Sequence, residues 1–431
     1  MIKNPEWEIT DKRLKRLDLE RTALNVAVAS FERQLYGDPF PYASLSTGND
    51  IYKRARSISR GVARINKDDL CPFDRAVYQD VSTHGEMASA YHSYFIDIKS
   101  KMRIGKFLSD FYEPGIFTGF LNSVRPENMP HDELYEEALL MSGAFTKTPD
   151  SLVVGYGNSA LSKRNQRKLV DALGRSVDIV NPFYESLGIV PVECDIELGP
   201  AGGGFSYWLG GTSMAVIDPD RFSFSSGTYD TFLPSLILAH ELGHAQQEKQ
   251  GNNLPSGLNP SASEYSVSFH GQCGEGAALA IEGEFVDYSK KKKIFSQEDQ
   301  KKMELFWSTY LPKKRFQIAH DLLERQWIEE MANPDFPESL KRNAHVELAR
   351  ITNIKCFEDD FSFCDFSAMD SLQQMSYHIG NKNIRRIMNR FKKEGVPRDL
   401  SFNAILQGVW VNSRAQEDFI FNSYLPRMMG K

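Results

Sequence analysis

Apolar and charged residues recur with helical spacing over most of the first 187 residues. Residues 11–36, 69–111 and 162–187 place apolar side chains three and four positions apart, which is the period of an α-helix with one buried face. Short breaks fall at Pro- and Gly-containing sites such as residues 113–115. The pattern predicts a mostly helical N-terminal region over residues 1–187.

From residue 188 the pattern changes. Residues 188–218 are rich in glycine, β-branched and aromatic residues, which predicts two or three short strands. Helical spacing returns with a helix over residues 231–250, a second over 264–288, and further helices to the C-terminus. We expect a mainly α protein with a small β-sheet next to the 231–250 helix. Residues 188–431 then form either a second region or the continuation of one body.

Composition and charge narrow the class of protein. The 431 residues are 41% hydrophobic and 12% aromatic, enough for a large core. The net charge is −6, and the basic run Lys290–Lys293 follows a predicted helix, where a solvated helix end is expected. We therefore expect neither a nucleic-acid partner nor a membrane partner. The charge pattern leaves the oligomeric state open.

The cysteine pattern and the N-terminal residues predict a location. The five cysteines are scattered without a CxxC pair, which is typical of a reducing compartment. The chain starts without an apolar signal segment and contains no run of about 18 apolar residues. We expect a cytoplasmic protein, and export that needs no signal peptide stays open.

The segment His240-Glu241-Leu242-Gly243-His244 carries the candidate chemistry. Residues four apart share one face of a helix, so both imidazoles can bind a single ion at about 2.0–2.1 Å. Glu241 lies beside that ion, where a carboxylate can take a proton from a metal-bound water. The alternative is a core helix whose His and Glu side chains are satisfied by hydrogen bonds alone.

A third ligand is expected from the next helix. Glu275 lies between Gly274 and Gly276, and these glycines allow two helices to approach closely. Glu282 follows on the same face, where it can hydrogen-bond a ligand histidine. Rival third ligands are Glu282, Glu264 and His270. A di-iron centre is less well supported, since the chain holds no second ExxH motif.

These motifs make the chain similar to the helical gluzincins. It resembles in particular the bacterial zincin-like family known as domain of unknown function 885, and more distantly carboxypeptidase Taq and the thimet-type oligopeptidases. The segment HELGHAQQ resembles the family's histidine motif, and Gln247 matches the Gln of that motif. The segment EGAALAIE resembles the family's EGWALYAE. The segment QQMSYHIGNKNIRRI resembles a late motif of the family and matches it at Gln373, Tyr377 and Gly380. The resemblance covers about residue 188 to the C-terminus.

The resemblance implies a zinc metallopeptidase with a helical zincin-like fold and a substrate cleft. One Zn²⁺ ion would be held by His240, His244 and Glu275, with Glu241 as the general base. Tyr377 would hydrogen-bond the oxyanion, and the substrate would be a peptide or protein.

Neighbouring residues are expected to support the ligands or contact the substrate. Glu282 and Gln247 would hydrogen-bond the ligand side chains. Residues 212–218 would form an edge strand that aligns an extended peptide along the backbone of Met214 and Ala215. Tyr207 and Trp208 would wall a side-chain pocket, or pack in the sheet core.

Departures from the family pattern leave other functions open. The histidine motif lacks two residues that the family carries, Ala277 and residues 279–281 replace an aromatic pair, and Met388 stands where an Arg is expected. An effector or toxin protease that cuts one specific protein would show the same motif. So would a zinc-dependent enzyme that modifies a peptide or a small amide without cleaving peptides, or a binding module that keeps the metal for stability.

Overall fold

The computed structural model describes about two thirds of the chain. For strands β2 and β3 below, and for the ends of several helices, the description covers the backbone only. The described residues are 7–35, 48–97, 100, 102–124, 163–198, 204–209, 212–217, 232–255, 258, 267–308, 322, 325–326, 329 and 368–430.

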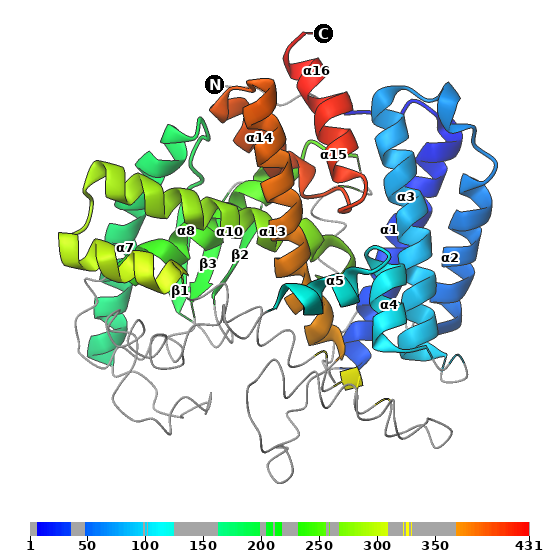
Figure 1. Ribbon diagram of the computed structural model, residues 1–431, viewed down its shortest axis with the longest axis horizontal. Coiled ribbons are helices and arrows are strands. Elements are labelled where there is room, and N and C mark those ends of the chain that lie inside the picture. Colours follow the sequence, from blue (N-terminus) through cyan, green and yellow to red (C-terminus); the bar gives the residue numbers. More distant parts are fainter. Residues whose placement is uncertain are drawn as a thin grey trace.

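The described chain is mainly helical, as the periodicity predicts (Figure 1). Its first half contains α1 (Lys12–Leu35), α2 (Gly48–Val62), η1 (Lys67–Asp69), α3 (Pro72–Tyr91), η2 (His92–Ile96), α4 (Ile104–Phe111), α5 (Ile116–Ser123) and α7 (Lys163–Ser186). Its second half contains α8 (Phe232–Gly251), α10 (Val267–Lys292), α13 (Ala368–Glu394), α14 (Arg398–Gly408), α15 (Gln416–Asp418), η6 (Phe419–Tyr424) and α16 (Leu425–Met428). None of the helices within the described ranges combines the length and the apolar character needed to cross a lipid bilayer.

Three short strands lie beside α8 and form one sheet with the order β1-β3-β2 (Figure 1). The strands are β1 (Cys194–Leu198), β2 (Gly204–Leu209) and β3 (Thr212–Ile217). β1 pairs with β3 in parallel, and β2 pairs with β3 in antiparallel orientation.

The expectation that residues 212–218 form an edge strand is wrong for the described sheet. Met214 is paired with Asp195 on one side and with Tyr207 on the other, and Ala215 is likewise paired on both sides. The strand that comes last in sequence lies in the centre, because β1 pairs with it and not with β2. The backbone of Met214 and Ala215 therefore pairs with strands on both sides, and neither residue can align a peptide.

Two hydrophobic cores share α10 and α14. The first core joins α1–α5 to α13–α16, and Cys273 and Ala277 of α10 belong to it. The second joins α7 to α8, and Ile281 and Phe285 of α10 belong to it. Figure 1 shows α1–α3 at one end of the molecule and α7, α8 and the sheet at the other, with α13 between them. Through its two faces, α10 holds both halves together.

A charged cluster is buried among the N-terminal helices. The guanidinium of Arg21 ion-pairs with Asp18 on α1 and with Asp80 on α3, and these three side chains are at most 1% exposed. Oδ1 of Asp80 also accepts hydrogen bonds from the backbone N of Asn412 at 2.7 Å and from its Nδ2 at 2.8 Å. Because an uncompensated buried charge is strongly destabilising, this cluster fixes α1, α3 and the turn before α15 to one another.

Helices α10 and α13 cross with their backbones in contact at Gly276. A Cβ atom at Gly276 would lie 2.0 Å from the carbonyl carbon of Gly380 and 2.3 Å from the backbone N of Asn381. Real Cβ atoms do not approach backbone atoms so closely, so only glycine fits here. Gly276 follows Glu275 directly, and the crossing therefore sets the position of that carboxylate.

We expect Gly276→Ala to destabilise the protein by at least about 2 kcal/mol, since backbone must move to admit the methyl group. Denaturant unfolding followed by circular dichroism measures the change. Gly174→Ala in α7 is the matched control, because nothing lies within 4 Å of its added Cβ. That variant should be unchanged or more stable by up to about 1 kcal/mol. Equal stability of the two variants would contradict the backbone contact between α10 and α13 at Gly276.

Candidate metal centre

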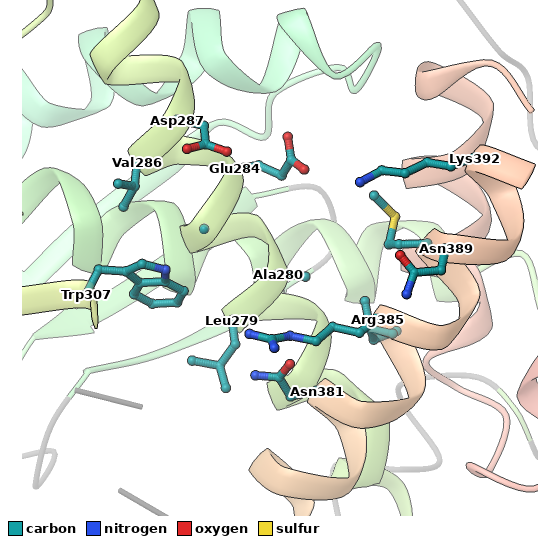
Figure 2. Close-up of a pocket in the computed structure, with 13 residues that line it drawn as sticks. Leu279, Ala280, Glu284, Val286, Asp287, Trp307, Asn381, Arg385, Asn389 and Lys392 are labelled. Carbon is teal, nitrogen blue, oxygen red and sulfur yellow. The ribbon is translucent and has the colours of Figure 1, made fainter. Parts of the chain in front are cut away.

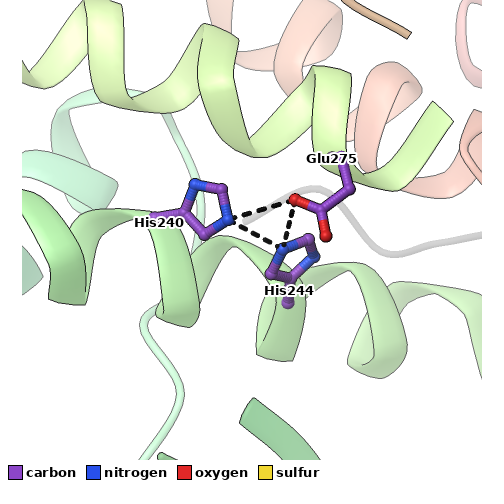
Figure 3. Close-up of side chains that lie close together, drawn as sticks. All are labelled: His240, His244 and Glu275. Atoms are coloured by element: carbon purple, nitrogen blue, oxygen red, sulfur yellow. Dashed lines mark hydrogen bonds and ion pairs between the residues drawn. The ribbon is translucent and has the colours of Figure 1, made fainter. Parts of the chain in front are cut away.

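The structure brings His240, His244 and Glu275 together at the interface of α8 and α10 (Figure 3). Nε2 of His240 lies 3.1 Å from Nε2 of His244. Oε2 of Glu275 lies 3.3 Å from Nε2 of His240 and 3.4 Å from Nε2 of His244. Three potential ligand atoms from two helices thus form a nearly equilateral triangle.

The size of this triangle fits a tetrahedral metal ion. An ion with ligand atoms at about 2.0–2.1 Å separates those atoms from one another by roughly 3.3–3.4 Å. Two imidazole nitrogens and one carboxylate oxygen are a donor set that zinc commonly binds in hydrolytic enzymes. The Oε2 atom of Glu275 is buried and has no hydrogen-bond partner among the described residues. The donor atoms therefore fit a divalent ion of zinc's size.

Hydrogen bonds fix how both imidazoles are turned. Nδ1 of His240 contacts Oε1 of Glu282, and Nδ1 of His244 lies 3.2 Å from Oε1 of Gln247. Carboxylate and carboxamide oxygens are acceptors, so each Nδ1 carries a proton and donates it. When the second proton of each imidazole is lost, a lone pair remains on each Nε2 and points into the triangle. Glu282, a rival for third ligand, lies on the opposite side of His240 from the triangle.

Gln247 also connects the two helices that carry the cluster. Its Nε2 donates to the backbone O of Gly274 at 2.9 Å, one residue before Glu275. A Cβ at Gly274 would lie 3.1 Å from Oε1 of Gln247, so a small residue is favoured there. A second close approach lies at Gly243, where an added Cβ would meet Ile281 of α10 at 3.2 Å. Glycines on both helices therefore permit the separation that the triangle needs.

The cluster has more buried acid than neutral imidazoles can balance. Glu241, Glu275 and Glu282 contribute three carboxylates, and their side chains are largely buried. Burial disfavours the charged imidazolium, but Glu282 and Glu275 outweigh it and raise the pKa of His240 well above its usual value. At His244, burial lowers the pKa, but the neighbouring Glu275 outweighs this effect, so the pKa of His244 is also raised. Either protons on the imidazoles or a divalent cation can compensate the carboxylates.

The pKa values of Glu241 and Glu275 are shifted in opposite directions, although both carboxyl groups are buried. Burial raises the pKa of Glu241, and the nearby His240 and His244 offset this only in part. Burial also opposes ionisation of Glu275, but His244 and His240 lower the pKa of Glu275 well below its usual value. A raised pKa makes Glu241 the better proton acceptor near neutral pH, while Glu275 stays ionised.

The structure describes the other predicted site residues only in part. Tyr377 lies half-buried on α13, one turn before Gly380, whose backbone contacts Gly276. The strands that hold Tyr207 and Trp208 are described for the backbone only. Glu264 and the side chains of His270 and Gln373 lie outside the described residues.

Two residues that support α8 were not anticipated from the sequence. The hydroxyl of Tyr184 on α7 donates to the backbone O of Ala239 at 2.6 Å, next to His240. Nε1 of Trp410 donates to the backbone O of Gln247 at 2.7 Å. Both partners are backbone atoms, which carry no sequence signal, and both contacts span long separations in the chain.

Metal binding by this cluster should become tighter as the pH rises. Because the pKa values of His240 and His244 are raised, the metal-free imidazoles keep their second protons to higher pH than usual, and an ion must displace these protons. We expect the apparent zinc affinity to increase by about tenfold per pH unit for each displaced proton, and proton release on binding. Zinc titration between pH 6 and 8, by calorimetry in buffers of different ionisation enthalpy, measures both.

Two results would check this expectation. The wild-type chain should bind about one zinc ion, and His244→Ala should lose this binding, while replacement of His92, which lies on η2, should leave it unchanged. An affinity that is independent of pH would contradict the protonated state of the metal-free cluster.

Comparisons with known proteins were made at the levels of sequence and structure. No protein-family model matches the chain, and no curated protein matches it either. A structure from Shewanella oneidensis, described as a lipoprotein of unknown function, is similar with a TM-score of 0.41 and 14% identity, over 92% of this chain and 82% of that chain. A Pyrococcus furiosus carboxypeptidase is similar with a TM-score of 0.37 and 12% identity, over 98% of this chain and 97% of that chain. Both likenesses are too remote to assign an activity.

Proposed function

We propose that this chain is a zinc-dependent metallopeptidase with His240, His244 and Glu275 as the metal ligands. The observation that carries the proposal is the triangle of two Nε2 atoms and one Oε2 atom, with sides of 3.1–3.4 Å. The hydrogen bonds at both Nδ1 atoms support it, because they direct the free lone pairs toward one point.

Glu241 is the proposed general base. When bound, the ion supplies Lewis acidity that polarises a carbonyl group and makes water a better nucleophile. The carboxylate of Glu241 accepts the proton that water loses and then donates it to the leaving amine. Burial, which raises the pKa of Glu241, suits both steps near neutral pH.

Tyr377 is the proposed donor to the oxyanion. It lies on α13 one turn before the crossing at Gly276, the residue that follows Glu275. A tyrosine hydroxyl can donate a hydrogen bond to the negative oxygen that develops at the scissile carbonyl. The resemblance to the helical gluzincins supports this role, because Tyr377 matches the family's late motif.

An extended peptide is the proposed substrate. The free edges of the described sheet belong to β1 and β2, and α8 packs against β2. An edge strand can pair with the backbone of a bound peptide. We propose β2, in place of β3, as the strand that aligns the substrate next to α8.

We expect Glu241→Gln to retain about one zinc per chain and to lose about 10²–10⁴-fold in turnover, since the amide cannot accept a proton. Cleavage of a quenched fluorescent peptide library, together with metal analysis, measures both quantities. Glu248→Gln on the same helix is the matched control and should keep its activity. Full activity in zinc-loaded Glu241→Gln would refute the general-base role.

We expect Tyr377→Phe to lower kcat by about 10²-fold while KM changes little, because the hydroxyl acts on the developing charge and not on the bound substrate. Steady-state kinetics on a peptide cleaved by the wild-type chain provide the test. Tyr52→Phe on α2 is the control, as that ring is 40% exposed. An unchanged kcat would remove Tyr377 from the mechanism.

A further inference from the structure

A cavity of about 480 Å³ lies between α10 and α13, separate from the metal cluster. Its volume falls in the range of small-molecule sites, roughly 300–1,000 Å³. Residues of α10 between 279 and 287 form one wall, residues of α13 between 381 and 392 form the other, and Trp307 closes one side (Figure 2). None of the residues in the triangle lines it. The same helix thus carries the metal cluster on one face and this cavity on the other.

One end of the cavity presents hydrogen-bond donors. The side chains of Arg385 and Asn381 extend from α13 toward Leu279, and the indole of Trp307 faces them (Figure 2). Asn381 is only 7% exposed, and neither its amide nor the Arg385 guanidinium has a hydrogen-bond or ion-pair partner among the described residues. A guanidinium beside an amide N–H matches the geometry of a carboxylate.

The other end of the cavity presents carboxylates. Glu284 and Asp287 project from α10, and the amine of Lys392 approaches from α13 (Figure 2). Glu284 is already paired with Arg398, whereas Asp287 is exposed and has no ion-pair partner among the described residues. Two acids and two bases line the cavity, so their formal charges cancel. A ligand with one positive and one negative end is favoured over a simple anion.

The length of the cavity sets the size of that ligand. Leu279 and Asp287 are eight positions apart on α10, which corresponds to about 12 Å along the helix. An extended peptide of three residues spans at most about 10–11 Å. Between the two ends, the cavity is lined by Ala280 and Gly283 of α10 and by the apolar side chain of Met388 of α13. An apolar middle with charged ends corresponds to a short peptide with free termini.

We propose that this cavity binds a short peptide of about three residues. Arg385 and Asn381 hold the terminal carboxylate, Asp287 holds the terminal ammonium group, and the apolar side chains contact Trp307 and Met388. The site does not depend on the metal cluster or on the activity proposed for it.

Calorimetric titration with trileucine tests the proposal on the full-length chain carrying Glu241→Gln, so that no peptide is consumed. We expect saturable binding of one peptide per chain. Trileucine amide should bind at least about tenfold more weakly, since it lacks the carboxylate that Arg385 pairs with, and N-acetyl-trileucine should also be weakened. Absence of trileucine binding, or equal binding of the blocked peptides, would overturn the proposal.

Variants test whether trileucine binds in this cavity. Arg385→Gln should weaken trileucine binding at least about tenfold, whereas Arg386→Gln, whose guanidinium pairs with Glu417 at 2.9 Å, should not. His244→Ala should bind trileucine as well as its parent does. Unaltered binding in Arg385→Gln, or lost binding in a folded His244→Ala, would place the peptide elsewhere and reject the site.

Discussion

The burial of five ionisable side chains between α8 and α10 is the constraint on which the site depends. Two imidazoles and three carboxylates lie there largely out of water. Buried charges are tolerated only when they are compensated and hydrogen-bonded. The Nδ1 hydrogen bonds to Glu282 and Gln247 meet part of this requirement, and the cation proposed for the three remaining ligand atoms would meet the rest.

Helix α10 connects the buried cluster to the rest of the molecule. Its small residues let α8 approach near Gly274 and let the α13 backbone touch Gly276. Its larger apolar residues belong to both hydrophobic cores. Movement of α10 would therefore displace Glu275 and loosen the contact between the two halves.

Local sequence patterns predicted the bounds of the two helices that carry the cluster closely. The helix expected over residues 231–250 is observed at Phe232–Gly251, and the helix expected over 264–288 is observed at Val267–Lys292. The helical stretch expected over residues 69–111 is interrupted after Ile96. The separation into regions 1–187 and 188–431 stays a prediction, and the strand order could not be inferred because pairing joins residues that are distant in sequence.

The sequence by itself determined which side chains share a helix face. Spacing of four residues aligns His240 with His244, and flanking glycines mark Glu275 as a residue at a helix contact. Only the tertiary structure decided that the two helix faces meet with 3.1–3.4 Å between the potential ligand atoms. It also decided that Glu282 contacts Nδ1 of His240 instead of joining the triangle, and that β3 is the central strand. The physical reason is that periodicity is a local property, whereas distances between helices follow from packing of the whole core.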